Sequence, residues 1–371
     1  MDHTPLKQLN RLGQSIWLDF IERSILSNGD LAGLIQEDDL AGLTSNPAIF
    51  EKAISKDTTY GDDISRLAQA GMTREGLYTS LVLDDISRAA DLFLPVYERT
   101  NGRDGYVSIE VSPLLARDSE ASIREARELW THLKRPNIMI KIPGTTEGLV
   151  AVRTLLAEGI NVNVTLLFSV ERYDNVLEAY LQALENRLAQ GLPLNGVASV
   201  ASFFLSRIDS KVDALLDNMR DDSQAIAARE LRGRAAIASA ALAYRHYQSV
   251  IESPRWQRLA EAGAEVQRLL WASTSSKDPA YSDIKYVEPL IAKNTVNTLP
   301  LNTLDAYREQ GQPALRIDQS IAEADEVMSQ LAGLGVDIPA ITQALEEEGI
   351  KKFVEPYESI LTTLDRQRQA G

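Results

Sequence analysis

Eight short β-rich segments, separated by longer amphipathic stretches, constrain the fold of this 371-residue chain more than any other feature. Such alternation predicts parallel strands joined by right-handed helical crossovers. The segments span residues 15–20, 41–47, 105–111, 137–143, 161–168, 197–204, 267–275 and 294–300. Eight units, with no G-x-G-x-x-G turn after the first, predict an α/β fold of the closed (β/α)8 (TIM barrel) type rather than an open doubly wound sheet.

Additional helical sequence lies in three regions, at about 51–100, 222–263 and 318–367. No Pro/Gly/Ser-rich linker sets these regions apart. We therefore expect a single barrel domain over residues 1–371, with two helical insertions and C-terminal helices. Phe353 and Tyr357 stand four positions apart, which suggests that the last helix lies across the barrel helices and shapes the mouth of the barrel.

Composition excludes several classes of function. The chain has 38 basic and 53 acidic residues, a net charge of -15 and no basic stripe, which argues against a nucleic-acid or membrane partner. It has no cysteine and only three histidines, so thiolate chemistry is excluded and proton transfers fall to carboxylates, hydroxyls, lysine or water. No apolar leader or spanning segment is evident, which predicts a soluble, cytoplasmic protein, either monomer or homodimer.

One lysine, Lys141, stands inside the most apolar short segment of the chain, RPNIMIKIPGT at 135–145. An unpaired charge in a dry interior is costly, so a buried ammonium must find a partner or lose its proton. Considered alone, Lys141 fits a structural ion pair as well as a functional site.

The polar residues of the strands can be assigned to one face, because successive strand side chains point to opposite sides. Helices cover the outside of a barrel, so its apolar positions point outward; in 161–168 these are Val162, Val164, Leu166 and Phe168. The polar residues predicted to point inward at or near the C-terminal strand ends are Asp19, Asn46, Glu110, Lys141 and Thr165. Thr44 shares the strand end of Asn46, and Asn163 shares the inward face of Thr165. Barrel enzymes hold their active sites at that end, and a structural network would not need all its members there.

This set of residues supports imine chemistry. A lysine among apolar side chains offers a free amine that attacks carbonyl groups. Glu110 and Thr165 would then serve the proton transfers of imine formation and hydrolysis, directly or through one water, and Asp19 could deprotonate the hydroxyl whose carbon is released. The asparagines would bind substrate hydroxyls.

Two places favour a phosphate group. Ser206 and Arg207 fall in the first turn of the helix after the sixth strand, where backbone N–H groups and the helix dipole attract anions, and Ser273 and Lys277 follow the seventh strand. Acidic pairs such as Asp38–Asp39 and Asp84–Asp85 are expected to be solvated rather than to bind metal.

Four segments resemble transaldolases. GLTSNPAIF at 42–50 resembles the G-[IV]-T-[ST]-N-P signature of that family, and IMIKIPGTTEGL at 138–149 resembles its segment around the Schiff-base lysine. INVNVTLLFS at 160–169 and ASFFLSRID at 201–209 are similar to transaldolase segments as well. The resemblance runs in order from the first strand to beyond the eighth, and the helical additions look like the longer bacterial form of the family.

The resemblance implies an enzyme of the pentose phosphate pathway that moves a dihydroxyacetone unit from sedoheptulose 7-phosphate to glyceraldehyde 3-phosphate, giving erythrose 4-phosphate and fructose 6-phosphate. It implies no cofactor and no metal. It assigns Lys141 to the imine, Asp19 to C–C cleavage, and Glu110 and Thr165 to the catalytic water; the substrate-lining positions are Asn46, Asn163, Ser202 and Phe204, and Arg207 is the phosphate arginine.

One departure from the family pattern concerns the second phosphate cation. Many transaldolases have Ser-x-Arg after the seventh strand, whereas this chain reads ASTSSKDP with Ser273 and no arginine. Lys277 is the substitute that we expect.

Two alternative functions are also consistent with the sequence. A fructose-6-phosphate-type aldolase on the same barrel would release the three-carbon unit instead of handing it to an acceptor. A non-catalytic sugar-phosphate-binding barrel, or a scaffold that uses the helices of 222–263, belongs to a different class, because fold alone does not prove function.

Overall fold

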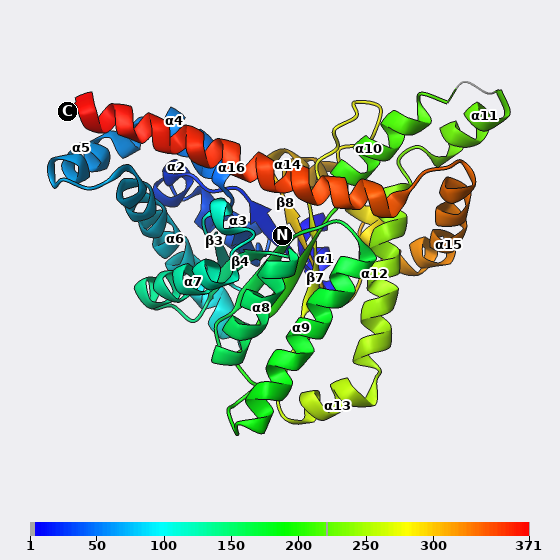
Figure 1. Ribbon diagram of the computed structural model, residues 1–371, viewed down its shortest axis with the longest axis horizontal. Coiled ribbons are helices and arrows are strands. Elements are labelled where there is room, and N and C mark those ends of the chain that lie inside the picture. Colours follow the sequence, from blue (N-terminus) through cyan, green and yellow to red (C-terminus); the bar gives the residue numbers. More distant parts are fainter. Residues whose placement is uncertain (1–3, 220–221, 371) are drawn as a thin grey trace.

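The computed structural model describes residues 4–219 and 222–370. Each predicted β segment contains a strand, and the eight strands close into a barrel in sequence order, with every neighbouring pair parallel. The predicted (β/α)8 barrel is therefore confirmed (Figure 1). The strands are β1 (Gln14–Asp19), β2 (Gly42–Thr44), β3 (Tyr106–Glu110), β4 (Ile138–Pro143), β5 (Val162–Leu167), β6 (Ser199–Phe204), β7 (Arg268–Ala272) and β8 (Thr295–Leu299).

Helices surround this barrel and extend beyond it. The α-helices are α1 (Pro5–Leu12), α2 (Arg23–Ser27), α3 (Asp30–Glu37), α4 (Pro47–Lys56), α5 (Gly61–Gln69), α6 (Arg74–Arg99), α7 (Ser119–Leu133), α8 (Thr146–Glu158), α9 (Val170–Ala189), α10 (Ser206–Leu216), α11 (Asp222–Leu231), α12 (Ala235–Ile251), α13 (Pro254–Glu261), α14 (Leu301–Gln310), α15 (Ile317–Gly333) and α16 (Ile338–Ala370). The short 3-10 helices in the described residues are η1 (Thr58–Tyr60), η2 (Pro113–Leu115) and η3 (Glu288–Leu290).

Side-chain caps start the helices that follow β3, β4 and β5. Asp118, Thr145 and Ser169 accept hydrogen bonds from backbone N–H groups in the first turns of α7, α8 and α9. Each cap satisfies a donor that has no partner inside its helix, which stabilises a helix start by about 1 kcal/mol. The caps therefore set where each strand's loop ends and its crossover helix begins.

Large side chains fill the barrel towards the N-terminal ends of its strands. Trp17 lies completely buried against Gly42, where a β-carbon would come within 2.6 Å of the indole ring. The Trp17 ring also lies 6.3 Å from that of Tyr106. Below them, Arg268 forms an ion pair of 2.9 Å with Asp104. This packed floor leaves the opposite, C-terminal end of the barrel as the place for a site.

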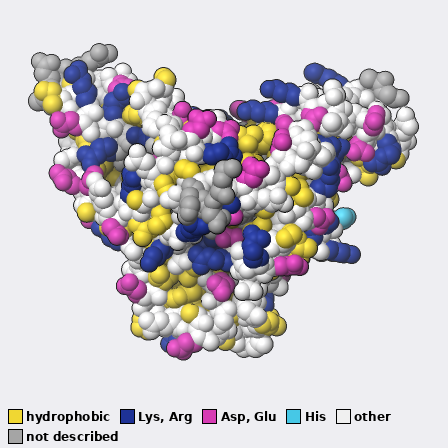
Figure 2. All heavy atoms as spheres, turned by 180° about the vertical axis from the view of Figure 1, so that it is seen from behind, with side chains coloured by type: hydrophobic (Ala, Val, Ile, Leu, Met, Phe, Trp, Pro, Cys, Tyr) yellow, Lys and Arg dark blue, Asp and Glu magenta, His cyan; other side chains and the backbone are white. Residues whose placement is uncertain are grey.

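The longest helix, α16, lies across the C-terminal end of the barrel. It runs over the top of the molecule in Figure 1 and packs against α4, α6, α10 and β5. Phe353 and Tyr357 are both buried on the side that faces the barrel, in agreement with the hypothesis that this helix shapes the mouth. Seen from behind, the molecular outline is hollowed between two arms, and basic and acidic side chains are interspersed over that face (Figure 2).

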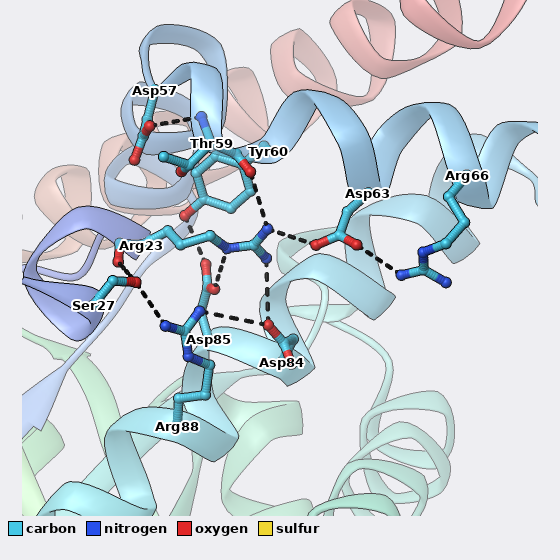
Figure 3. Close-up of polar contacts among 10 residues, drawn as sticks. All are labelled: Arg23, Ser27, Asp57, Thr59, Tyr60, Asp63, Arg66, Asp84, Asp85 and Arg88. Atoms are coloured by element: carbon cyan, nitrogen blue, oxygen red, sulfur yellow. Dashed lines mark hydrogen bonds and ion pairs between the residues drawn. The ribbon is translucent and has the colours of Figure 1, made fainter.

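Two of the acidic pairs expected to be solvated each contain a buried carboxylate, so that expectation was wrong for Asp85 and Asp38. Asp85 is 0% exposed and accepts hydrogen bonds from Arg23 Nε at 3.0 Å and from Tyr60 Oη at 2.6 Å. Figure 3 shows Arg23 between Asp85 and the further carboxylates of Asp63 and Asp84. Asp38 pairs with Arg308 in the same way. Distant arginines, invisible in the local sequence, compensate these charges.

The second strand is shorter than predicted. β2 ends at Thr44, and Asn46, expected near its end, is instead the N-cap of α4: its Oδ1 accepts a hydrogen bond of 3.0 Å from the N–H of Ile49. Asn followed by Pro is a helix-start signal, and it prevails here over the β pattern.

Candidate active site

Lys141 projects from β4 into the C-terminal mouth of the barrel, and its side chain is 5% exposed. Its Nζ lies 3.8 Å from Oε2 of Glu110 on the neighbouring strand β3 and donates a hydrogen bond of 3.1 Å to the carbonyl oxygen of Ser45. The ring of Phe353 from α16 lies 5.6 Å from the same nitrogen. The amine is therefore held between one carboxylate, one carbonyl and an aromatic face.

Glu110 is nearly inaccessible, with its side chain 3% exposed. Burial raises the pKa of this carboxyl to about 7, against the opposing effect of Lys141, and the charge of Asp19 adds to the rise. Neither carboxylate oxygen has a hydrogen-bond partner among the described residues. Glu110 can thus change protonation state near neutral pH, which suits it to general acid–base chemistry.

Asp19 occupies the end of β1 in the same mouth. Thr44 Oγ1 donates a hydrogen bond of 2.8 Å to Asp19 Oδ1, and the same hydroxyl lies 2.7 Å from Oγ1 of Thr298. Burial raises the pKa of Asp19, and the charges of Lys141 and Lys277 and the hydrogen bond from Thr44 oppose that rise. Both lysines are therefore within electrostatic reach of the carboxylate.

A chain of short polar side chains crosses the floor of the mouth. Ser202 Oγ donates to Asn163 Oδ1 at 2.7 Å, and Asn163 Nδ2 donates to Ser108 Oγ at 3.0 Å. Both amide ends of Asn163 are thus fixed in orientation. Thr165 Oγ1 is buried and has no hydrogen-bond partner among the described residues.

The predicted face alternation of β5 is correct up to Thr165 and then fails. The register between β5 and β6 shifts after Val164, and Leu166 has a φ of +62°, a backbone conformation that bulky residues rarely adopt. A β-carbon on Gly349 of α16 would come within 3.0 Å of Leu166 and 3.4 Å of Phe168. The bulge therefore turns Leu166 and Phe168 toward α16 instead of toward the outer helices.

Two cations stand at the rim of the mouth. Arg207, in the first turn of α10, lies 5.8 Å from the ring of Phe204, and its Nη1 is buried with no hydrogen-bond partner among the described residues. Burial lowers the pKa of Lys277, the charge of Arg207 lowers it further, and Asp19 raises it. Lys277 therefore lies within electrostatic reach of both Arg207 and Asp19.

A hydroxyl pair closes this rim. Ser206 Oγ and Ser273 Oγ lie 2.9 Å apart, joining the start of α10 to the end of β7. Ser273 has a φ of +54°, a left-handed conformation that is uncommon for serine and tends to occur at functional sites.

The mouth thus combines a buried amine, two buried carboxyls and two rim cations. A buried amine beside a carboxyl that ionises near pH 7 can form an imine with a ketone, and a second carboxylate can move a hydroxyl proton. Among the described residues, no three or more His, Asp or Glu side chains gather in a way that could hold a metal ion.

Comparison with known proteins agrees with this chemistry. Residues 16–364 match the family described as transaldolase/fructose-6-phosphate aldolase. A protein named transaldolase 2 from a Nostoc species is 47% identical over 367 residues, which cover 97% of this chain and 96% of that protein. The chain belongs to the transaldolase/fructose-6-phosphate aldolase family.

Two further relatives extend the match. A transaldolase of Thiobacillus denitrificans is 46% identical, covering 96% of this chain and 99% of its own length. One from Mycolicibacterium smegmatis is 43% identical, covering 99% of this chain and 98% of its own length. The family match therefore includes the barrel, both insertions and most of α16.

Two contacts in the mouth of this family member were not found by sequence reasoning. The Ser45 carbonyl that accepts from Lys141 carries no side-chain signal, because any residue could supply it. Thr298 in β8 shares inward parity with its neighbours, and its side chain reaches Thr44; the polar run NTVNT at 294–298 is the signal that could have revealed it.

Proposed function

We propose that this chain is a transaldolase, a transferase of the pentose phosphate pathway that carries a dihydroxyacetone unit as an imine on Lys141. The observation that carries the proposal is the buried contact between Lys141 and Glu110, whose carboxyl has a pKa of about 7, with Asp19 in the same mouth. The donor would be sedoheptulose 7-phosphate and the acceptor glyceraldehyde 3-phosphate, as the family resemblance implies.

The first step is imine formation. Glu110 takes a proton from the Lys141 ammonium, and the free amine attacks the ketone carbon to give a carbinolamine. Glu110, with Thr165 helping to orient the leaving oxygen, returns the proton to the carbinolamine hydroxyl, which departs as water and leaves a protonated imine. The 3.8 Å separation between Lys141 and Glu110 is close to direct hydrogen-bond reach and leaves either direct or one-water transfer possible.

The second step breaks a carbon–carbon bond. Asp19 takes the proton of the hydroxyl on the carbon to be released, that carbon becomes the carbonyl of the departing aldose, and the bond electrons move to the imine nitrogen. The raised pKa of Asp19 makes this carboxylate a stronger base than an exposed one. Addition of an acceptor aldose reverses the step, and hydrolysis of the new imine frees the product.

The rim cations would position the phosphate group. Arg207 lies at the start of α10, where the helix dipole attracts an anion. Lys277 would be the second cation, and Ser273 and Ser206 would offer hydroxyls. Asn163, Ser202 and Phe204 would line the sugar, together with Asn46, whose Nδ2 is the end left for substrate because Oδ1 caps α4.

Borohydride trapping tests the proposal. The protein would be incubated with fructose 6-phosphate and borohydride and then digested for peptide mass spectrometry. We expect a reduced dihydroxyacetone adduct on Lys141. No adduct on a folded sample, or an adduct on another lysine only, would overturn the proposal and favour a sugar-phosphate-binding barrel.

The family description also includes fructose-6-phosphate aldolases, so acceptor dependence must be measured. With fructose 6-phosphate alone, a transaldolase stalls at the trapped three-carbon unit until an aldose phosphate arrives. Steady release of free dihydroxyacetone without an acceptor would favour the aldolase.

We also propose that the barrel, the two insertions and the C-terminal helices act as one domain. Helix α16 packs against α4, α5 and α6 of the first insertion and against the barrel strand β5, while α12 of the second insertion packs against α9, α10 and α15. No helix in the described part of the chain is long and apolar enough to cross a membrane. We propose a cytoplasmic location, where sugar phosphates are available.

A further inference from the structure

A cavity of about 30 Å³ lies beside Glu110, between the ends of β2 and β3 and the helices α4, α6, α7 and α16. Glu110 and Asn46 line both this cavity and the mouth, whereas Lys141, Asp19 and Thr165 do not line the cavity, so the cavity adjoins the mouth. A single water needs roughly 10–15 Å³ of such space and two to four polar partners. The cavity therefore has room for one or two waters.

Its lining supplies those partners. The polar residues that line the cavity are Ser45, Asn46, Tyr78, Thr79, Glu110, Ser112, Glu125 and Tyr357. Oε1 of Glu125 accepts a hydrogen bond of 3.0 Å from the N–H of Ser112, and burial raises the pKa of Glu125. The second carboxyl oxygen of Glu125 stays available for a water.

Tyr78 lines the same cavity as Glu110. Burial raises the pKa of Tyr78, and the charges of Tyr357, Glu110 and Glu125 raise it further. The phenol is therefore within electrostatic reach of both carboxylates. Its ring packs edge-on against that of Tyr357, with 5.2 Å between centroids, which fixes its position.

The residues around the cavity differ in exposure. Thr79, one of its lining residues, is exposed, while Glu110 at the other end has a side chain only 3% exposed. The cavity is thus lined both by the buried residue Glu110 and by an exposed residue of α6.

The chemistry of the proposed reaction creates a need for a path for water. Each imine that forms on Lys141 releases one water, and each imine that hydrolyses consumes one. We propose that the cavity is a water port, through which the water of imine formation and hydrolysis reaches Glu110 while substrate occupies the mouth. This inference rests on the proposed function.

Oxygen exchange tests the port. In water enriched in ¹⁸O, every cycle of imine formation and hydrolysis places labelled oxygen in the C2 carbonyl of fructose 6-phosphate, above the rate without enzyme. Val82 is buried on α6 and lines the cavity. Val82→Ile adds one methyl group to its wall, and we expect carbonyl exchange to slow by about fivefold or more.

A second readout separates a port from a general structural role. Once a donor has placed the three-carbon unit on Lys141, addition of that unit to glyceraldehyde 3-phosphate needs no water. Borohydride trapping reports this step, because the trapped adduct gains the mass of the acceptor. We expect that rate to be unchanged in Val82→Ile. The matched control is Val96→Ile, also buried on α6 but outside the cavity lining, which should leave both rates unchanged.

Tyr78→Phe is the second variant, because it removes only the phenol oxygen and keeps the ring packing. We expect slower exchange with unchanged carbon–carbon bond formation. Exchange at the parent rate in both folded variants, or equal slowing of both rates, would overturn the port. If the parent itself formed no adduct on Lys141, the proposed function would fail, and the port with it.

Discussion

At the scale of single residues, two opposing effects determine the pKa of Glu110. Burial favours its neutral form, while the nearby Lys141 favours its charged form, and burial prevails to bring the pKa to about 7. An ordinary glutamate in an unfolded chain ionises near pH 4.5. The folded protein therefore holds a proton on Glu110 over a pH range where the unfolded chain has lost it.

This difference predicts a pH-dependent stability. Between about pH 4.5 and 7 the native state binds more protons at Glu110, so the contribution of this residue to the free energy of unfolding falls as pH rises, by about 3 kcal/mol in total. In Glu110→Gln that contribution should vanish. Urea unfolding at pH 5 and pH 8 measures it, and the same pH slope in both proteins would contradict the assignment.

Asp19 allows a prediction that separates the two chemical steps. Asp19→Asn should still form the imine on Lys141, since Glu110 serves that step, but it should lose C–C cleavage by about 10²–10⁴-fold. Borohydride trapping with fructose 6-phosphate should then yield an adduct of the whole hexose phosphate instead of the three-carbon unit. Asp30→Asn, at an exposed position, is the control. A three-carbon adduct in Asp19→Asn would rule out this role.

Sequence periodicity could predict most of this residue set. The alternation of side-chain direction along each strand assigned Asp19, Glu110, Lys141 and Thr165 to the inner face, because the outer face of barrel strands must be apolar. It could not predict the bulge at Leu166, since a positive φ in a leucine depends on tertiary contacts with Gly349. It also could not assign the Ser45 carbonyl to Lys141, because backbone atoms are common to all residues.

At the scale of elements, the ion-pair cluster around Arg23 joins the start of the chain to the first insertion. Arg23 belongs to α2, directly after the strand that carries Asp19, while Asp85 lies on α6 and Tyr60 in η1 (Figure 3). The guanidinium carbon lies 4.2 Å from the centre of the Tyr60 ring. The cluster thus fixes the insertion helices against α2, the helix that follows β1.

Arg23→Met should therefore destabilise the protein strongly. It leaves Asp85 buried without its cation, a change that typically costs about 3–5 kcal/mol. Arg66→Met, at the exposed edge of the same cluster, should cost less than about 1 kcal/mol because solvent screens its pair with Asp63. Denaturant unfolding of both variants measures the difference, and equal losses would contradict a buried network.

Element order and helix starts were predictable, while partners between elements were not. Local capping residues and strand composition determine where helices and strands form, so each β segment was found. The sequence around Asp84 and Asp85 reads as a solvated acidic pair. The burial of Asp85 depends on Arg23, about sixty positions away in the sequence. No local sequence pattern indicates that partner.

At the scale of the whole molecule, α16 completes the mouth. It brings Phe353 to within 5.6 Å of the Lys141 amine and packs against elements from both sides of the barrel. The proposed imine on Lys141 would be shielded from bulk water by this helix, as a transferase requires while it waits for an acceptor.

Truncation after Asp337 tests that shielding. We expect the shortened protein to lose stability and to release dihydroxyacetone from fructose 6-phosphate without an acceptor, because bulk water reaches the imine. Phe353→Ala is the milder variant, with an expected cost of about 3–5 kcal/mol for a buried phenylalanine. A coupled assay for free dihydroxyacetone and thermal unfolding give the two readouts. Unchanged kinetics and stability in the truncated protein would exclude a role for α16.

The position of Phe353 in the chain has a consequence for synthesis in the cell. Lys141 leaves the ribosome 212 residues before Phe353 (353 − 141 = 212). At roughly 5–20 residues per second, this interval lasts about 10–40 s. During it the growing chain has Lys141 without its aromatic cover, so the ring that lies over the amine is added only after all eight barrel strands have been made.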